Sequence, residues 1–137
     1  FIHWGHDISP EENQYQAGLK FAISYKKNVD FIGKEALMKI KDKELDKRLM
    51  MFTLKDSMPG EPLLLHDEPI YLDNKIIGQT TSGNYSFCYE KNLSFGYVNS
   101  GNSIETLKDK NVFIEVEKKK YPVSILEKAL NIKNYKN

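Results

Sequence analysis

The stretch PIYLDNKIIGQTT, residues 69–81, decides the fold of this chain because it has the pattern of a complete β-hairpin. Two runs rich in β-branched and aromatic residues, 69–72 and 75–81, flank the dipeptide Asp73-Asn74. A two-residue turn between such runs is a strong local sign of paired antiparallel strands. The sequence therefore predicts an antiparallel sheet in the middle of the chain.

Further strands are predicted on both sides of this hairpin. Residues 48–55 and 93–98 each have the pattern of a strand. A second hairpin is expected from strands at 112–117 and 121–126, joined by a turn at 118–120. Several short strands at hairpin spacing favour an antiparallel β-barrel or a sandwich, so the predicted fold class is mainly β.

The first 45 residues have a different pattern. The run Ser9-Pro10-Glu11-Glu12 is a capping box and predicts a short helix that Gly18 would end. Residues 21–25 predict a strand, and the apolar residues within 33–43 recur at helical spacing. We therefore expect a short N-terminal α/β segment, joined to the strands by a charged connector at 42–47.

Composition and charge exclude several classes of partner. The chain has 137 residues, of which 40% are hydrophobic, which suits one compact domain with a buried core. Its formal charge is +1, so neither nucleic acid nor an anionic membrane surface is expected to bind. The chain has no apolar run of about 18 residues and no secretory leader at its start. We expect a soluble protein, and a reducing compartment agrees with the single cysteine, Cys88.

Few side chains form a pattern with catalytic meaning. His3 and His6 have the spacing of metal ligands on a helix, but Gly5 lies between them and a third ligand is lacking, so no metal site is predicted. Residues 78–86 are rich in hydroxyl groups without a phosphate-binding glycine pattern, and such stretches more often satisfy their own turns. Cys88 is interpreted as a small buried hydrophobic residue without a catalytic base.

Trp4 has two interpretations. A lone tryptophan is more often a core anchor, but an indole also offers a flat apolar face and one N–H donor for stacking on a heterocycle. The run His66-Asp67-Glu68 is interpreted as a solvated turn rather than an acid–base pair.

Several motifs, in order and at matching spacing, closely resemble the glycine-cleavage T-protein (aminomethyltransferase) family. They are WGHDIS at 4–9, YQAGLKFA at 15–22 and DFIGKEAL at 30–37, followed by GQTTSG at 78–83 and LSFGYV at 93–98. The last two resemble the C-terminal barrel of that family, so the resemblance implies a barrel rather than a sandwich.

The resemblance covers the chain from Phe1 to about Lys128. The forms HWGHD at 3–7 and TTSGNY at 80–85 are most similar to the folate-dependent C-terminal region of dimethylglycine and sarcosine dehydrogenases.

The resemblance implies that the complete protein transfers a one-carbon unit from a methylamine-type or glycine-type donor to tetrahydrofolate. It places the end of the folate-binding domain and a connecting helix at 1–45, the barrel at 46–130 and a polar tail at 131–137. The catalytic aspartate of the family belongs to the upstream domain, so no catalytic residue is assigned here and the isolated chain is expected to be inactive.

The start at Phe1 rather than Met agrees with a piece of a longer protein. The partners implied are the upstream folate-binding domain, tetrahydrofolate and a small methylamine-type substrate, with FAD only in the parent protein. The location implied is the cytoplasm, or the mitochondrial matrix in a eukaryote.

By position, the resemblance implies six folate-binding residues. They are Trp4, His3, His6, Ser82, Tyr85 and Lys128. Two alternatives remain open: a non-catalytic barrel that binds another ligand or a protein, and a folate-dependent demethylase of the same superfamily.

Overall fold

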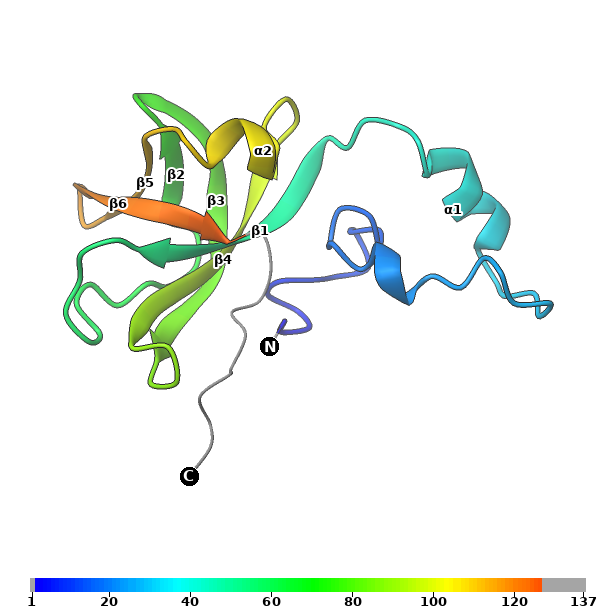
Figure 1. The fold of residues 1–137 in the computed structure, drawn as a ribbon, viewed down its shortest axis with the longest axis horizontal. Helices are drawn as coiled ribbons and strands as arrows, with labels where there is room; N and C mark the ends of the chain where they lie inside the picture. Colours follow the sequence, from blue (N-terminus) through cyan, green and yellow to red (C-terminus); the bar gives the residue numbers. More distant parts are fainter. Residues whose placement is uncertain (1, 127–137) are drawn as a thin grey trace.

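The computed structural model describes residues 2–126, whose six strands form a closed barrel (Figure 1). The strands are β1 (Lys47–Leu54), β2 (Pro69–Leu72), β3 (Lys75–Ser86), β4 (Lys91–Asn99), β5 (Val112–Val116) and β6 (Lys119–Leu126). They follow one another around the barrel in the order β1-β4-β3-β2-β5-β6, and all neighbours are antiparallel. The predicted antiparallel barrel is therefore confirmed. Lys128 and the predicted tail 131–137 lie outside the described residues.

Strand β1 closes the barrel because it pairs along both of its edges. Met51, Phe52 and Thr53 face β4 on one side and β6 on the other. Closure gives each strand two neighbours, so the ring has no free sheet edge. The inward side chains form one apolar core, which includes Phe52, Leu64, Ile70, Val98, Ile114 and Val123.

The two predicted hairpins are present, with shifts at their ends. The β2–β3 turn lies at Asp73-Asn74 as predicted. The β5–β6 turn lies at Glu117-Lys118, where both residues have positive φ, and not at 118–120. Strand β3 continues to Ser86, so the hydroxyl-rich stretch 78–86 lies within a strand and not in a turn.

Helix α2 (Ile104–Leu107) was not predicted. Ser103 and Thr106 cap it reciprocally: the Thr106 N–H donates to Ser103 Oγ, and the Ser103 N–H donates to Thr106 Oγ1. A capping box normally has Glu or Gln where Thr106 stands, so the usual sequence signal is weak here. Leu107 packs into the barrel core.

The predicted helix from Ser9 to Gly18 is wrong, although one of its two capping-box contacts forms. The Ser9 N–H donates to Glu12 Oε2 at 2.8 Å, as a capping box requires. Asn13 then accepts two backbone N–H groups on its Oδ1, which starts a second turn. A side chain that bonds to nearby backbone in this way competes with helix formation, so the chain makes successive turns.

The strand predicted at 21–25 is also wrong. The chain forms a 3-10 helix, η1 (Lys20–Ala22), and Phe21 is 85% exposed. A strand needs a hydrogen-bonding neighbour, and none of the described strands pairs with this segment. The helix predicted at 33–43 is confirmed as the shorter α1 (Lys34–Ile40), which buries none of its residues.

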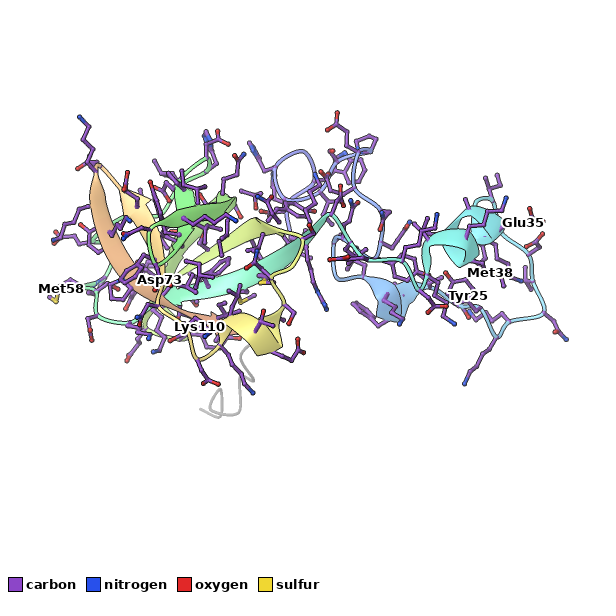
Figure 2. The ribbon with its side chains drawn as sticks, turned by 90° about the horizontal axis from the view of Figure 1, so that it is seen from above. Tyr25, Glu35, Met38, Met58, Asp73 and Lys110 are labelled. Carbon is purple, nitrogen blue, oxygen red and sulfur yellow. The ribbon has the colours of Figure 1, made fainter. Side chains whose placement is uncertain are left out.

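The N-terminal part of the chain divides into two regions. Residues 2–17 lie against the barrel, where the Leu49 N–H of β1 donates to the carbonyl of Gln16 at 2.8 Å. The buried Tyr15 hydrogen-bonds through its hydroxyl to Tyr25 and to the Leu37 carbonyl, both in residues 18–45. Residues 18–45, called the arm below, extend away from the barrel: Figure 1 shows α1 at one end of the molecule, and Figure 2 shows Met38 of α1 at the end opposite Met58. Neither helix within the described residues has the length or apolar stretch needed to cross a membrane.

A substitution at Gly78 tests how closely the backbones of β3 and β4 approach each other. A Cβ at this position would lie 2.0 Å from the backbone oxygen of Tyr97. We expect Gly78→Val to lower the free energy of unfolding by about 3 kcal/mol, because backbone must move to admit the side chain. Urea unfolding measures this loss. The control is Gly101→Ala, where a Cβ meets open space but φ is +80°, so about 1 kcal/mol is expected. Equal losses in the two variants would contradict the close approach.

Candidate functional site

A cleft of about 560 Å³ lies between the N-terminal segment and the barrel. Residues of β1, β3 and β4 form one wall of the cleft, and residues within 5–12 and 66–67 form the rest of its lining. Its titratable lining residues are His6, Glu12, Lys47, His66, Asp67 and Tyr97. A cleft with this lining suits a ligand that has polar and charged groups.

Asp7 fixes the N-terminal segment to the barrel beside this cleft. It is 1% exposed, and its carboxylate accepts hydrogen bonds from Thr81 Oγ1, from Ser82 Oγ at 2.7 Å and from the His3 N–H at 2.7 Å. Its backbone carbonyl accepts from Tyr97 Oη at 2.9 Å. Hydrogen bonds to a carboxylate are stronger than those between neutral groups, and this set allows a carboxylate to be buried.

A β-bulge in β3 supplies two of these donors. The register with β4 shifts between Thr80 and Ser82, so Thr81 is an extra residue. In a regular strand successive side chains point to opposite faces, but the bulge allows Thr81 and Ser82 both to donate to Asp7. Thr80 has another partner, since its hydroxyl donates to the Leu65 carbonyl at 3.0 Å.

An ion pair lines the cleft. Lys47 Nζ lies 2.6 Å from Glu12 Oε1 and 4.8 Å from the centroid of the Tyr97 ring. Burial raises the pKa of Glu12, but hydrogen bonds from Lys47 and Ser9 outweigh burial and leave that pKa below its usual value. Burial, with the nearby charges of Glu12 and Asp7, raises the pKa of the Tyr97 phenol. The phenol therefore stays protonated and can donate to the Asp7 carbonyl.

The three histidines of the chain follow one another at the side of the cleft. The ring centroids of His3 and His6 are 4.7 Å apart, and those of His6 and His66 are 6.3 Å apart. His66 Nδ1 lies 2.8 Å from Asp67 Oδ2. Within residues 2–126, no three His, Cys, Asp or Glu side chains are grouped so that they could hold a metal ion.

The structure brings part of the predicted folate site together at this cleft. His6 lines it, and the His3 ring lies against that of His6. Trp4 is 68% exposed and immediately precedes the lining residue Gly5. The interpretation of Trp4 as a core anchor is therefore wrong, and its indole is free to meet a ligand or another domain.

The other predicted site residues lie elsewhere. The hydroxyl of Ser82 bonds to Asp7, and the ring of Tyr85 contacts that of Phe87 edge-on at 5.1 Å between centroids. Neither is among the cleft-lining residues, and Lys128 lies outside the described part of the chain. The folate-binding role of the six residues stays a prediction. Cys88, interpreted as buried, is exposed in the β3–β4 turn.

Sequence reasoning missed Asp7, the residue with the most hydrogen-bond partners in this region. The partners in β3 are 74 and 75 residues further along the chain. The resemblance includes Asp7 in the run WGHDIS, but the run itself does not show what the carboxylate contacts.

Known proteins that resemble this chain indicate the family to which it belongs. The model of the glycine cleavage T-protein C-terminal barrel domain matches residues 47–130. Human mitochondrial dimethylglycine dehydrogenase is 35% identical over 136 residues, which are 95% of this chain and 14% of that protein. The mouse mitochondrial pyruvate dehydrogenase phosphatase regulatory subunit is 36% identical over 101 residues, 73% of this chain and 12% of that protein. The chain thus spans a small fraction of the length of these relatives.

A solved structure has the same fold. The crystal structure of the glycine cleavage system aminomethyltransferase T from Bartonella henselae superposes with a TM-score of 0.71 at 22% sequence identity. The match covers 91% of this chain and 34% of that chain. A share of 91% is more than the barrel alone provides, so the fold likeness extends into the N-terminal segment.

The Glu12–Lys47 pair predicts a pH-dependent stability. Because the pKa of Glu12 is lowered by folding, the ionised carboxylate stabilises the fold above its usual value of 4.5, and this stabilisation is lost as the pH falls below 4.5. We expect Glu12→Gln to lower the free energy of unfolding at pH 7 by about 1–2 kcal/mol, measured by urea unfolding. The difference from the native chain should shrink below pH 4.5. Exposed Glu11→Gln is the control, and a Glu12 difference that persists unchanged at acid pH would argue against the pair.

Proposed function

This chain belongs to the glycine cleavage T-protein family through its C-terminal barrel domain, and on that premise we propose that it is part of an enzyme that transfers a one-carbon unit to tetrahydrofolate. The donor in this proposal is a methylamine-type or glycine-type compound. The human relative is named as a dehydrogenase of dimethylglycine, a methylamine, and this supports the donor class.

One observation carries the proposal: an exposed indole stands on a fixed loop beside a polar cleft. Trp4 lies three residues before Asp7, whose carboxylate and carbonyl are bound by the barrel. An exposed indole offers a flat apolar face, and the heterocycle of tetrahydrofolate contains a planar pyrimidinone ring with hydrogen-bonding edges. Trp4 with His6 therefore suits one side of that heterocycle, and the cleft offers groups that hydrogen-bond to its polar edge.

In this proposal the chain binds and shields rather than reacts. Tetrahydrofolate, when bound, accepts the one-carbon unit, and the family resemblance assigns the catalytic aspartate to the upstream domain. The barrel and its loop supply a wall that keeps water from the reacting groups. A flavin, where the parent protein carries one, belongs outside this chain, which has no Gly-rich dinucleotide-binding sequence.

The arm is the part of the chain that joins the upstream domain. Helix α1 has seven residues and buries none of them, and an isolated helix of that length is unstable in water. Phe21 and Val29 are exposed, Ile32 is fully exposed, and Met38 is exposed on α1 (Figure 2). Such a density of exposed apolar side chains marks a surface that another part of the protein covers. This supports the predicted boundary for residues 18–45, whereas residues 2–17, which the prediction also assigns to the folate-binding domain, hydrogen-bond to the barrel.

A second candidate function is a barrel that binds without catalysis. The mouse relative is named as a regulatory subunit of a phosphatase, so the same domain occurs in a protein whose name describes regulation. This candidate predicts that the complete protein binds no tetrahydrofolate. Both relatives are named as mitochondrial, which supports the mitochondrial matrix as the location of a eukaryotic parent.

Trp4→Ala tests the folate site. In the complete protein we expect tetrahydrofolate to bind about 10-fold more weakly, because a stacked ring loses about 1.4 kcal/mol of contact. The melting temperature should change little, since Trp4 is mostly exposed. Isothermal titration and thermal unfolding measure the two quantities, with the exposed Met58→Ala as control. A large drop in melting temperature with unchanged affinity would overturn the assignment.

Ile32→Ser with Met38→Ser tests the covering of the arm. If the upstream domain buries these side chains, the double variant of the complete protein should lose several kcal/mol of stability, about 2 for each buried side chain. It should also be cut by protease within residues 18–45 faster than the native protein. Met58→Ser, a similarly exposed residue at the far end of the barrel, is the control (Figure 2). Equal cutting of the native and double-variant proteins would exclude burial of the arm.

A further inference from the structure

We propose that Asp7 is a positioning residue, which holds the loop of residues 3–8 on the barrel and thereby sets Trp4 and His6 for the ligand. The inference rests on the proposed function in one respect, because the ligand is taken to be tetrahydrofolate. The positioning itself is a property of this chain and can be measured without the ligand.

The loop is closed on itself by short hydrogen bonds. The Asp7 N–H donates to the His3 carbonyl at 2.8 Å, and the His3 N–H donates back to the Asp7 carboxylate at 2.7 Å. The Gly5 N–H donates to the Ile8 carbonyl at 2.8 Å. Trp4 and His6 therefore extend from a backbone that is fixed on both sides, while their side chains remain exposed.

The loop is joined to the barrel through Asp7. In the described residues, the hydrogen bonds between residues 3–8 and the barrel come from Thr81, Ser82 and Tyr97, and all of them end on Asp7. Two go to the carboxylate and one to the carbonyl. If the carboxylate were removed, the hydrogen bond from Tyr97 to the Asp7 carbonyl would be the one of these three that remains.

A fixed loop binds a ligand more tightly than a mobile one. Ordering a side chain or loop on binding costs free energy, and a receptor that is already ordered avoids that cost. Loss of the Asp7 carboxylate should therefore raise the KM for tetrahydrofolate and leave kcat nearly unchanged, since Asp7 does not touch the reacting atoms in this proposal.

The hydrogen-bond pattern at Asp7 also predicts which variant rescues. Asparagine can offer its Oδ1 to the His3 N–H and turn its Nδ2 toward Thr81 and Ser82, whose hydroxyls accept as well as donate. Asp7→Asn should thus preserve the loop, whereas Asp7→Ala should release it. A role that depended on the negative charge would fail in both variants.

The experiment uses the complete protein that contains this chain. Steady-state kinetics would give KM for tetrahydrofolate and kcat, and hydrogen exchange would give the protection of the backbone amides of residues 3–8. For Asp7→Ala we expect a KM raised about 10-fold, or 1.4 kcal/mol, and for Asp7→Asn at most about 3-fold. Exposed Asp56→Ala is the matched control and should match the native protein.

Ser82→Ala keeps the test decisive if Asp7→Ala does not fold. It removes one donor and leaves Thr81 and His3 on the carboxylate. Alone it should raise KM about 3-fold, and in the Trp4→Ala background it should raise KM by a smaller factor, because part of the loop's effect on the ligand is exerted through Trp4.

The outcomes separate the two claims. Faster exchange at residues 3–8 in Ser82→Ala, with a KM effect that is smaller in the Trp4→Ala background, supports positioning by Asp7. Unchanged exchange, or KM effects that simply multiply, overturns it. A native protein that does not bind tetrahydrofolate overturns the proposed function instead, and hydrogen exchange then still decides whether Asp7 holds the loop.

Discussion

The buried carboxylate of Asp7 is the interaction on which this end of the molecule depends. A carboxylate out of water needs donors on both oxygens, and loss of its partners would cost about 3–5 kcal/mol. Here the donors come from the loop itself and from β3, while Tyr97 of β4 holds the adjacent carbonyl. When the loop leaves the barrel, the carboxylate loses the hydroxyls of Thr81 and Ser82 and the carbonyl loses that of Tyr97, while the bond from the His3 N–H can remain. This constraint makes the N-terminal segment and the barrel one unit, and it places the wall of the cleft where two parts of the chain, far apart in sequence, meet.

The run Gly78-Gln79-Thr80-Thr81-Ser82-Gly83 meets several structural demands at once. A Cβ at Gly78 would collide with the backbone of Tyr97 in β4, and a Cβ at Gly83 would collide with Leu64, in the segment before β2. The Thr80 hydroxyl holds the segment before β2 by donating a hydrogen bond to the Leu65 carbonyl. The bulge directs the hydroxyls of Thr81 and Ser82 to Asp7. A hydroxyl-rich run of this kind resembles a ligand-binding loop in sequence. In the structure its hydroxyls are used to fix the part of the chain that carries the exposed indole.

Local signals were enough to predict the barrel but not the segment in front of it. The β2–β3 hairpin follows from its two-residue turn at Asp73-Asn74, and the other strands follow from alternation and composition. The helix expected after Ser9 failed because Asn13 competes for the same backbone groups, and the strand expected at 21–25 failed because a strand is defined by a neighbour. The sequence does not show that Asp7 accepts several hydrogen bonds, because its partners in β3 and β4 come together only when the barrel closes. The sequence allows two interpretations of Trp4, because the residue type alone does not determine whether the fold buries the side chain.

Two groups of exposed apolar side chains within residues 2–126 suit different partners. Trp4 stands on a loop tied to the barrel by Asp7, so its backbone is already ordered before anything binds. Phe21 and Ile32 belong to the arm, where α1 buries no residue and the contacts to the barrel are few. A small ligand gains most from a surface that is ordered in advance, because it has few contacts with which to compensate for lost entropy. A domain of the same polypeptide can order the arm as it covers it, since its interface is large. The rigid indole therefore suits a ligand, and the arm suits the upstream domain.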